Sequence, residues 1–230
     1  QSMTDRTYLG IDIGGTAVKF GLVNGEGVIV SEISEYPVKF DNYETPIIET
    51  VVKSAKEFMS KNNKAFFDIN GIGVSATGGI NSKLGIVEGS AGHIKNWEGT
   101  NIKKRLEAEF GMNTAVLNDA NAAALGEMWK GAAKGRGNVV VMTIGTGVGG
   151  GIIVDSKILL GKKGFAGEIG HIPVNVDGEK CSCGNTGCIE HYGSTSALVR
   201  NVKNAVISGE ITGINVDETD GRLIFKEVAA

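Results

Sequence analysis

Residues 8–23 read YLGIDIGGTAVKFGLV, and this stretch decides the fold. Two short apolar runs, 8–13 and 17–23, predict antiparallel strands joined by a turn at Gly-Gly-Thr, residues 14–16. Gly-Gly suits a plain hairpin turn. It also lets backbone amides face an anion, with a threonine hydroxyl beside them and Asp12 placed to hold Mg²⁺ directly or through water. The residues alone leave both interpretations open.

The pattern continues outward from this hairpin with further strands and helices. A third strand is expected over 28–34, and apolar positions at helical spacing predict a helix over 45–62. Further strands are expected over 71–75, 115–117, 138–144 and 151–155, and further helices over 102–110, 121–130 and 194–208. The second unit opens with strands, as the first does. We therefore expect an α/β chain of two domains, 3–117 and 118–230, with a cleft between them.

The composition is that of a soluble globular protein, with 41% hydrophobic and 21% charged residues. A formal net charge of -3 provides no basic field for nucleic acid or a membrane surface, so neither is expected as a partner. No apolar run approaches the ~20 residues that span a bilayer. Residues 1–3 lack the charged and apolar regions of a signal peptide, and we expect a cytoplasmic protein.

A second glycine-rich stretch, TIGTGVGGG at 143–151, also follows a predicted strand. Gly145, Gly147 and Gly150 match G-x-G-x-x-G, the dinucleotide-binding fingerprint, which requires a helix directly afterwards. The next residues, 152–154, are Ile-Ile-Val and favour a strand instead. We therefore interpret the stretch as a second phosphate-binding hairpin. Neither a Walker A sequence nor a protein-kinase catalytic loop occurs.

Asp119 lies between a predicted strand and a predicted helix, where the two domains would meet. A carboxylate at such a place can accept the proton of a substrate hydroxyl while the cleft positions that oxygen in line with a γ-phosphate. The alternative is a helix N-cap, a role worth ~1 kcal/mol that aspartate fills far more often. The two roles are compatible, and on spacing alone the cap is favoured.

Four residues of metal-binding type lie close together in the sequence: His171, Cys181, Cys183 and Cys188. Three thiols and one imidazole fit a closed tetrahedral Zn²⁺ site. An odd number of cysteines within residues 181–188 argues against a disulfide framework. The other interpretation is a set of free buried thiols. A closed four-ligand site orders a loop rather than activating water, because catalytic zinc keeps an open position.

Taken together, the motifs resemble those of the ROK family of bacterial sugar kinases and sugar-responsive repressors, within the actin/hexokinase/Hsp70 fold class. The resemblance runs from about Tyr8 to the end of the sequence. The motifs, in the family's order, are Asp12-Ile-Gly14-Gly15-Thr16 with Lys19, Asn118-Asp119-Ala-Asn121, Gly145-Thr146-Gly147-Val-Gly-Gly, and Glu168-Ile-Gly-His171 with Cys181-x-Cys183-Gly-x-x-Gly-Cys188-x-Glu190. The resemblance implies a two-domain, actin-like ATPase (ribonuclease H-like) fold with the active site in the interdomain cleft.

The resemblance also implies a role for each matching residue. Asp119 would be the catalytic base that accepts the sugar-hydroxyl proton. The sugar-binding residues would be Asn118, Asp119, Glu168, His171 and Glu190. The ATP phosphates would face the two hairpins, at Gly14, Gly15, Thr16, Lys19, Gly145, Thr146 and Gly147, with Asp12 near Mg²⁺. A structural Zn²⁺ held by His171 and the three cysteines, and assembly as a homodimer, are also expected.

Two features differ from the family pattern. Relatives continue past the position of Ala230, through a strand and a glycine-rich turn that hold the adenosine. We therefore expect the adenosine-binding residues to lie outside this sequence. Residues 75–79, SATGG, occupy the place where many relatives carry a proline before glycine. They lie where the sugar would sit, and so they leave its identity open.

The implied activity is that of an ATP-dependent hexose kinase, glucokinase-like, with the 6-hydroxyl as acceptor. An N-acetylmannosamine kinase is the alternative, to which residues 96–101 (NWEGTN) are similar. Fructose, allose and β-glucoside kinases stay open, because sugar choice depends on a few hydroxyl contacts. A repressor is not expected, since a strand that begins by residue 8 leaves no room for a winged-helix domain. A sugar-sensing regulator without catalysis is opposed by the intact Asp119 and both hairpins.

Overall fold

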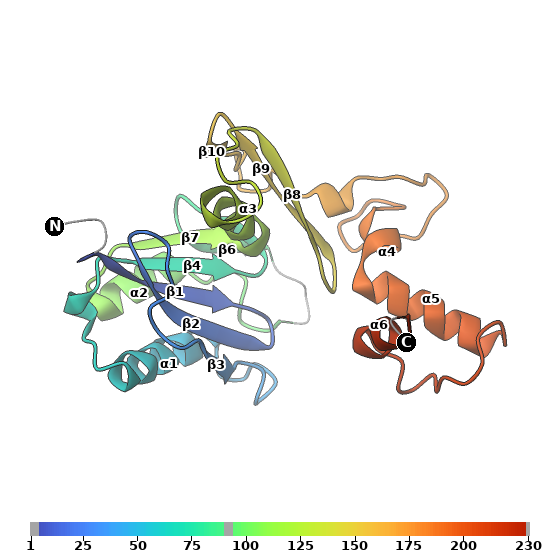
Figure 1. Ribbon diagram of the computed structural model, residues 1–230, viewed down its shortest axis with the longest axis horizontal. Coiled ribbons are helices and arrows are strands. Elements are labelled where there is room, and N and C mark those ends of the chain that lie inside the picture. Colours follow the sequence, from blue (N-terminus) through green and yellow to red (C-terminus); the bar gives the residue numbers. More distant parts are fainter. Residues whose placement is uncertain (1–4, 90–93, 229–230) are drawn as a thin grey trace.

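The computed structural model describes residues 5–89 and 94–228. Residues 1–4, which include the start of the predicted first domain, lie outside the described residues. The strands are β1 (Thr7–Ile13), β2 (Ala17–Asn24), β3 (Ser34–Pro37), β4 (Ile72–Ala76), β5 (Gly79–Asn81), β6 (Ile86–Gly89), β7 (Thr114–Asn118), β8 (Val139–Ile144), β9 (Val148–Val154) and β10 (Lys157–Ile158). The helices are α1 (Ile47–Lys61), α2 (Ile102–Phe110), α3 (Asp119–Lys130), α4 (Glu190–Gly193), α5 (Thr195–Ile207) and α6 (Gly221–Val228) (Figure 1).

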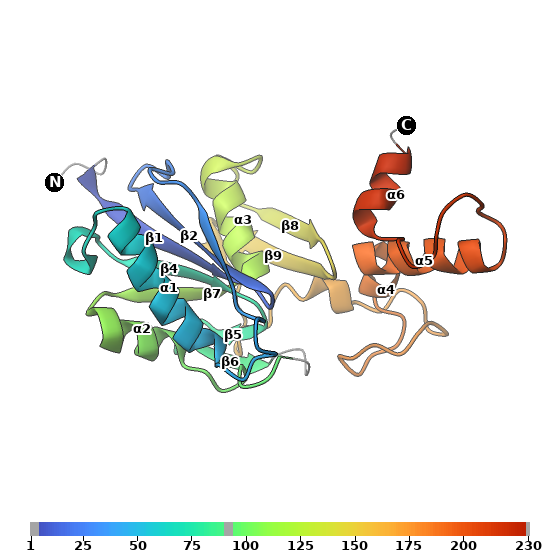
Figure 2. The ribbon, with the colours of Figure 1, turned by 90° about the horizontal axis from the view of Figure 1, so that it is seen from below.

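The first half of the chain folds around a five-stranded sheet in the order β3-β2-β1-β4-β7. β1 pairs antiparallel with β2 and parallel with β4, which is itself parallel to β7. Leu9, Ile11 and Ile13 point to one face and are at most 2% exposed, because successive side chains of a strand alternate between faces. The helices α1 and α2 lie against the sheet (Figure 2) and share its apolar core.

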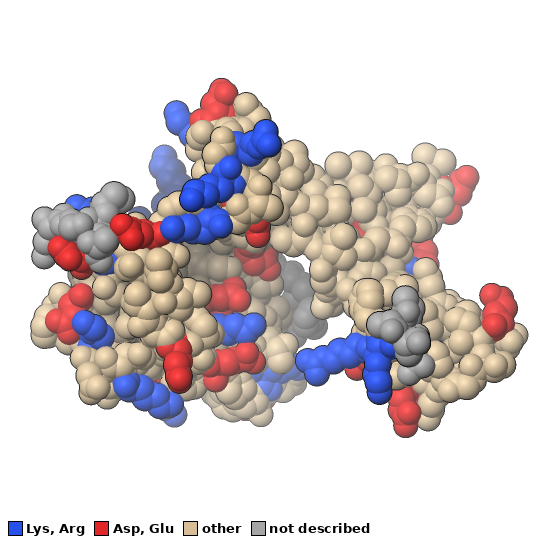
Figure 3. All heavy atoms as spheres, viewed as in Figure 1, with Lys and Arg blue, Asp and Glu red and all other residues tan. Residues whose placement is uncertain are grey.

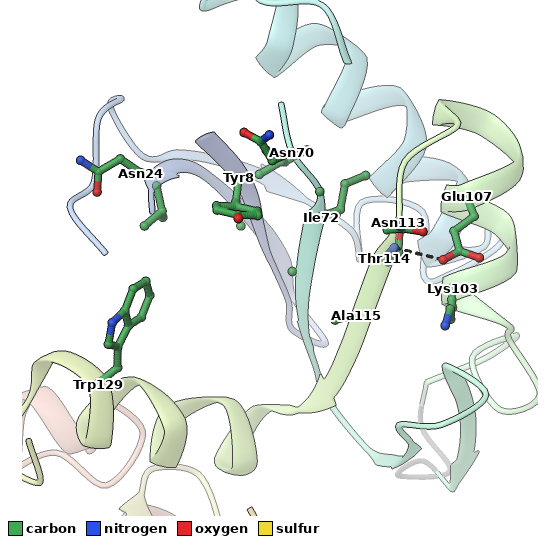
Figure 4. Close-up of a pocket in the computed structure, with 15 residues that line it drawn as sticks. Tyr8, Asn24, Asn70, Ile72, Lys103, Glu107, Asn113, Thr114, Ala115 and Trp129 are labelled. Carbon is green, nitrogen blue, oxygen red and sulfur yellow. Dashed lines mark hydrogen bonds between the residues drawn. The ribbon is translucent and has the colours of Figure 1, made fainter. Parts of the chain in front are cut away.

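The opposite face of this sheet is built from small residues. Gly21 pairs with Gly10, Gly10 with Gly73, and Gly73 with Ala115, so the row crosses four strands. Between this row and α3, whose Trp129 faces it, lies a cavity of about 1110 Å³ that reaches the carboxyl ends of the strands. A second cavity of about 580 Å³ extends instead to their amino ends (Figure 4).

The predicted third strand over 28–34 is wrong. In the structure β3 begins only at the end of that range, and Ile29 forms an isolated bridge to Val23. The ladder breaks because the Ser31 hydroxyl accepts a hydrogen bond at 2.9 Å from the amide of Leu22, a donor that a continuous third strand would use. Serine side chains compete with sheet ladders in this way.

The second half of the chain begins with α3, which packs against β8 and β9 of a three-stranded sheet in the order β10-β9-β8. The same helix contacts β4 and β7 of the first sheet, so it lies at the junction of the two halves. A largely irregular segment then leads to α4, α5 and α6 (Figure 1). The predicted strand over 151–155 begins earlier, at Val148, and the division into domains at 117/118 stays a prediction.

The surface carries charges of both signs, which are interspersed over the first half in the view of Figure 3. The same view shows a hollow between this half and the helices α4–α6. Arg105 of α2 pairs with Glu49 of α1 at 3.0 Å, which links the two covering helices. It also pairs with Glu109 of its own helix at 2.7 Å. Within the described residues, no helix is long and apolar enough to cross a membrane.

Candidate functional site

The parallel strands β1, β4 and β7 end along one edge of the sheet, and each carries a polar residue there. Asp12 lies opposite Ser75, whose hydroxyl donates to Asp12 Oδ1 at 2.8 Å. Asn118 ends β7 beside Ala76 of β4. Ligands of open α/β sheets bind outside the carboxyl ends of the strands. The exposed Asp12 carboxylate is therefore on the ligand-binding side of the sheet.

The first glycine turn joins β1 to β2 as predicted. The amide of Gly14 donates to the carbonyl of Ala17 at 2.9 Å and closes the turn. The hydroxyl of Tyr43 donates to the carbonyl of Gly15 at 2.7 Å, from a side chain that is only 2% exposed. Sequence reasoning missed this support, because no local pattern marks a tyrosine that is buried under a distant turn.

Lys19, a predicted phosphate-binding residue, has a side chain that is only loosely held. It pairs with Asp12 in the ladder and lines the larger cavity with it. Its Nζ lies 3.9 Å from the Glu35 carboxylate, and both side chains are more than half exposed. Such an exposed pair is worth about 1 kcal/mol or less, so the ammonium is free to turn toward an anion.

Asn118, and not Asp119, caps α3. Its Oδ1 accepts hydrogen bonds from the amides of Ala120 at 3.0 Å and Asn121 at 3.4 Å, while its Nδ2 donates to the carbonyl of Gly78 at 2.8 Å. The interpretation of Asp119 as the N-cap is wrong, since a cap residue has extended backbone and Asp119 is already the first helical residue. The Asp119 side chain accepts a 2.8 Å bond from the Ala120 amide.

The Asp119 carboxylate lies at the junction of the two halves and is still reached by solvent on one side. Burial of its other side raises the pKa of Asp119 above its ordinary value. Hydrogen bonds from the Ala120 amide and from Asn118 oppose this rise, and the negative charge of Asp12 adds to it. A general base works best when its pKa moves toward the operating pH. Asp119 is thus accessible from solvent, lies at the junction of the two halves and has a raised pKa.

The second glycine turn is held by residues of α4 and α5. The amide of Gly145 donates to the carbonyl of Gly147 at 2.9 Å, and the carbonyl of Gly145 accepts from the amide of Thr195 at 2.9 Å. The carboxylate of Glu190 accepts from the amide of Val148 at 2.9 Å. A Cβ at Gly147 would displace that carboxylate from its place beside the turn.

Glu168 lies in the irregular segment between β10 and α4, just before a 3₁₀ turn that contains His171. Burial raises the pKa of Glu168, the His171 ring lowers it, and the charges of Asp119 and Glu190 raise it further. Asp119 and Glu190 therefore lie near enough to Glu168 for their charges to act on it. Several carboxylates that converge in this way offer hydrogen-bond acceptors to a ligand with many hydroxyl groups.

The four predicted zinc ligands come together: His171, Cys181, Cys183 and Cys188 offer ligand atoms that all lie within 4.8 Å of one another. Zn–S bonds of about 2.3 Å at tetrahedral angles place two sulfurs about 3.8 Å apart. The Sγ atoms of Cys183 and Cys188 are 3.7 Å apart. The corresponding N···S separation is about 3.6 Å, and His171 Nδ1 lies 3.5 Å from Cys181 Sγ. The donor set and spacing fit tetrahedral zinc.

The electrostatics of the thiols agree with a site for a cation. Cys188 is fully buried, and its burial together with hydrogen bonds to the other two thiols raises its pKa to about 12. The pKa of Cys183 is lowered, chiefly by a hydrogen bond from the backbone of Asn185. Three thiols this close cannot all ionise without a bound positive charge. A bound metal ion would supply that charge, and the donor set and spacing of the four residues fit one.

Comparison with known proteins identifies the class of the molecule. The structure superimposes with a TM-score of 0.81 on a ROK family glucokinase from Streptomyces griseus in complex with glucose and AMPPNP, with 34% identity over 97% of this chain and 71% of that one. A putative N-acetylmannosamine kinase from Listeria monocytogenes gives 0.75, at 29% identity over 97% and 70%. The chain has the actin-like ATPase fold, as expected. The ROK family model matches residues 8–230, and the chain belongs to the ROK family.

Relatives in sequence include both enzymes and regulators. The chain is 38% identical to a glucokinase from Halalkalibacterium halodurans over 98% of this chain and 68% of the relative. It is 33% identical to a xylose repressor from Caldicellulosiruptor bescii over 95% of this chain and 55% of the relative. The chain spans 68% of the length of the Halalkalibacterium glucokinase and 58% of the length of two others, from Streptomyces coelicolor and Thermotoga maritima.

Proposed function

We propose that this protein is an ATP-dependent sugar kinase that transfers the γ-phosphoryl group of ATP to a hexose, with glucose as substrate and its 6-hydroxyl as acceptor. The observation that carries the proposal is the Asp119 carboxylate, which leaves capping to Asn118 and stays accessible at the junction of the two halves. The similarity to glucokinases over almost the entire chain supports the same reading.

The proposal assigns a role to each residue of the site. Asp119 accepts the proton of the acceptor hydroxyl, which makes the oxygen a nucleophile for the phosphorus. Glu168, His171 and Glu190 accept and donate hydrogen bonds to other hydroxyls of the sugar. The amide of Asn118 uses one N–H for Gly78, so a second N–H stays available to the sugar.

The phosphates of ATP would bind at the two glycine turns. Residues 14–16 and 145–147 both present at least partly exposed backbone at strand ends, beside the hydroxyls of Thr16 and Thr146. Asp12 would hold Mg²⁺ directly or through water, and Mg²⁺ neutralises charge on the phosphates when bound. Lys19 would approach the phosphates from the neighbouring strand.

Zinc would have a structural role in this enzyme. His171 and the three cysteines supply all four ligands of a closed site. His171 follows Glu168 by three residues, and Cys188 precedes Glu190 by two. Zinc would therefore hold the segment that carries both glutamates, without itself contacting the reacting hydroxyl.

An ADP-release assay on the full-length protein tests the proposal, with glucose, N-acetylmannosamine, fructose, allose and a β-glucoside as acceptors. The highest kcat/KM is expected with glucose, and a higher value with N-acetylmannosamine would favour the alternative to which the Listeria protein points. Sugar binding by calorimetry without turnover on any sugar would overturn the kinase and favour a sugar-sensing regulator, like the repressors among the relatives. Sedimentation analysis tests the expected homodimer.

A further inference from the structure

The loop over residues 160–167 is anchored at its base to the second half of the chain. The amide of Ala166 donates to the carbonyl of Leu160 at 3.1 Å and closes the loop on itself. Gly167 has a φ of 90°, and a Cβ there would lie 2.7 Å from the carbonyl oxygen of Gly150 in β9. The base therefore cannot move away from β9 without breaking close backbone packing.

The tip of the same loop contacts the first half of the chain, on the small hairpin of β5 and β6 (Figure 2). Gly79 and Gly89 pair across that hairpin, and the Phe165 ring covers both. A Cβ at Gly79 would overlap one edge of the ring, 2.7 Å from Cζ, whereas one at Gly89 would lie 3.9 Å away. Aromatic rings fill the space above strand glycines in this way.

This glycine pair belongs to the same structural unit as the proposed catalytic base. The carbonyl of Gly78 accepts from Asn118 Nδ2 at 2.8 Å, directly before Asp119. The carbonyl of Thr77 accepts at 2.9 Å from the indole of Trp97, which is fully buried. The Gly79–Gly89 pair is thus a platform that is hydrogen-bonded, through Gly78, to the N-cap residue of α3.

Phe165 precedes Glu168 by three residues, so the docked ring restrains this segment on the side of the first half, while Gly167 packs on β9. We propose that Phe165 is a positioning residue that docks the 160–167 loop on the Gly79–Gly89 platform and so holds the Glu168 segment in place at the sugar site. The inference rests on the proposed sugar-kinase function for its effect on catalysis. The docking itself does not depend on that function. Phe165 is 41% exposed and does not belong to the buried hydrophobic core.

A double-mutant cycle tests the docking contact. Phe165→Ala should raise the KM for sugar about tenfold, because the loop no longer holds Glu168 in place, with a smaller effect on kcat. Gly79→Ala should have a similar effect, because the new methyl group displaces the ring. In the double variant the two effects should not add, since residues in contact couple by about 2- to 150-fold. Gly89→Ala is the matched control, which leaves room for the ring, and Phe165→Tyr should keep near-normal kinetics.

Limited trypsin digestion gives a readout that needs no activity. Lys162 and Lys163 are exposed in this loop, next to the ring. Phe165→Ala and Gly79→Ala should both accelerate cleavage at these two lysines severalfold, identified by mass spectrometry, whereas Gly89→Ala should not. Unchanged cleavage in both variants at unchanged Tm, or full additivity in the cycle, would overturn the proposal. If accelerated cleavage occurs but no sugar is turned over, the docking stands and the proposed function fails.

Discussion

Asp119→Asn is the substitution that separates proton acceptance from every structural role at the start of α3. Asn118 caps the helix, so the cap is retained in the variant. The new amide keeps an oxygen that can accept the Ala120 amide, as the carboxylate does at 2.8 Å. The variant loses only the charge and the ability to accept a proton. Its fold is therefore expected to stay intact while its chemistry fails.

The magnitude of the kinetic effect follows from the role of the base. General-base catalysis contributes about 10²–10⁴-fold, or about 2.7–5.5 kcal/mol of barrier. We expect kcat to fall by that factor in the ADP-release assay, with sugar affinity within about tenfold of normal. Stability should rise slightly at pH 7, because burial and the charge of Asp12 disfavour the ionised Asp119. Solvent screening limits the gain to less than about 1 kcal/mol, so Tm rises by no more than about 4 °C.

Asn101→Ala is the matched control for this experiment. Asn101 caps α2 through a 2.9 Å bond to the amide of Lys104, at a helix that supplies none of the proposed site residues. Its removal should cost about 1 kcal/mol and lower Tm by about 2–4 °C, with kcat unchanged. Near-normal kcat in Asp119→Asn, or a Tm loss as large as that of the control, would refute the reasoning.

Three further predictions concern pH, zinc and the first hairpin. The acid limb of the pH profile of kcat/KM should lie above the usual aspartate range, because burial raises the pKa of Asp119; a limb near pH 4 or below would contradict this. In acid Asp119 is protonated in both the folded and the unfolded protein, so its raised pKa costs no stability there. As pH rises through the folded pKa, the buried charge lowers the stability of the native protein. Asp119→Asn should therefore raise Tm at pH 7 but not in acid. Cys183→Ser should abolish stoichiometric zinc by elemental analysis and increase hydrogen exchange over 171–190; unchanged metal content counts against the ligand set. Tyr43→Phe, which removes the bond to Gly15, should raise the KM for ATP about 2- to 10-fold with little change in the KM for sugar.

Much of the fold could be predicted from local signals. The helix over Ile102–Phe110 ends at Gly111 as expected, because its φ of 66° suits glycine. The predicted strand over 28–34 was wrong because the prediction rested on apolar residues. These do not reveal that the Ser31 hydroxyl accepts the hydrogen bond of the Leu22 amide. The assignment of the α3 cap differed by one residue. Pairing of Asn118 with Ala76 keeps Asn118 extended, and a one-residue boundary set by a neighbouring strand is invisible in the sequence.

The sequence by itself determined the glycine turns, the strands on either side of them, and the set of residues able to bind zinc. These features depend on residue type and short spacing, and such signals act within a few positions along the chain. Only the tertiary structure decided that Glu190 reaches the amide of Val148, 42 residues away, and that Phe165 covers the Gly79–Gly89 pair. Those contacts depend on how helices and sheets pack, because closure of a long loop leaves no local pattern. The opening hairpin at 8–23 was thus predictable from local signals, while packing alone brought Glu190 to the second glycine turn.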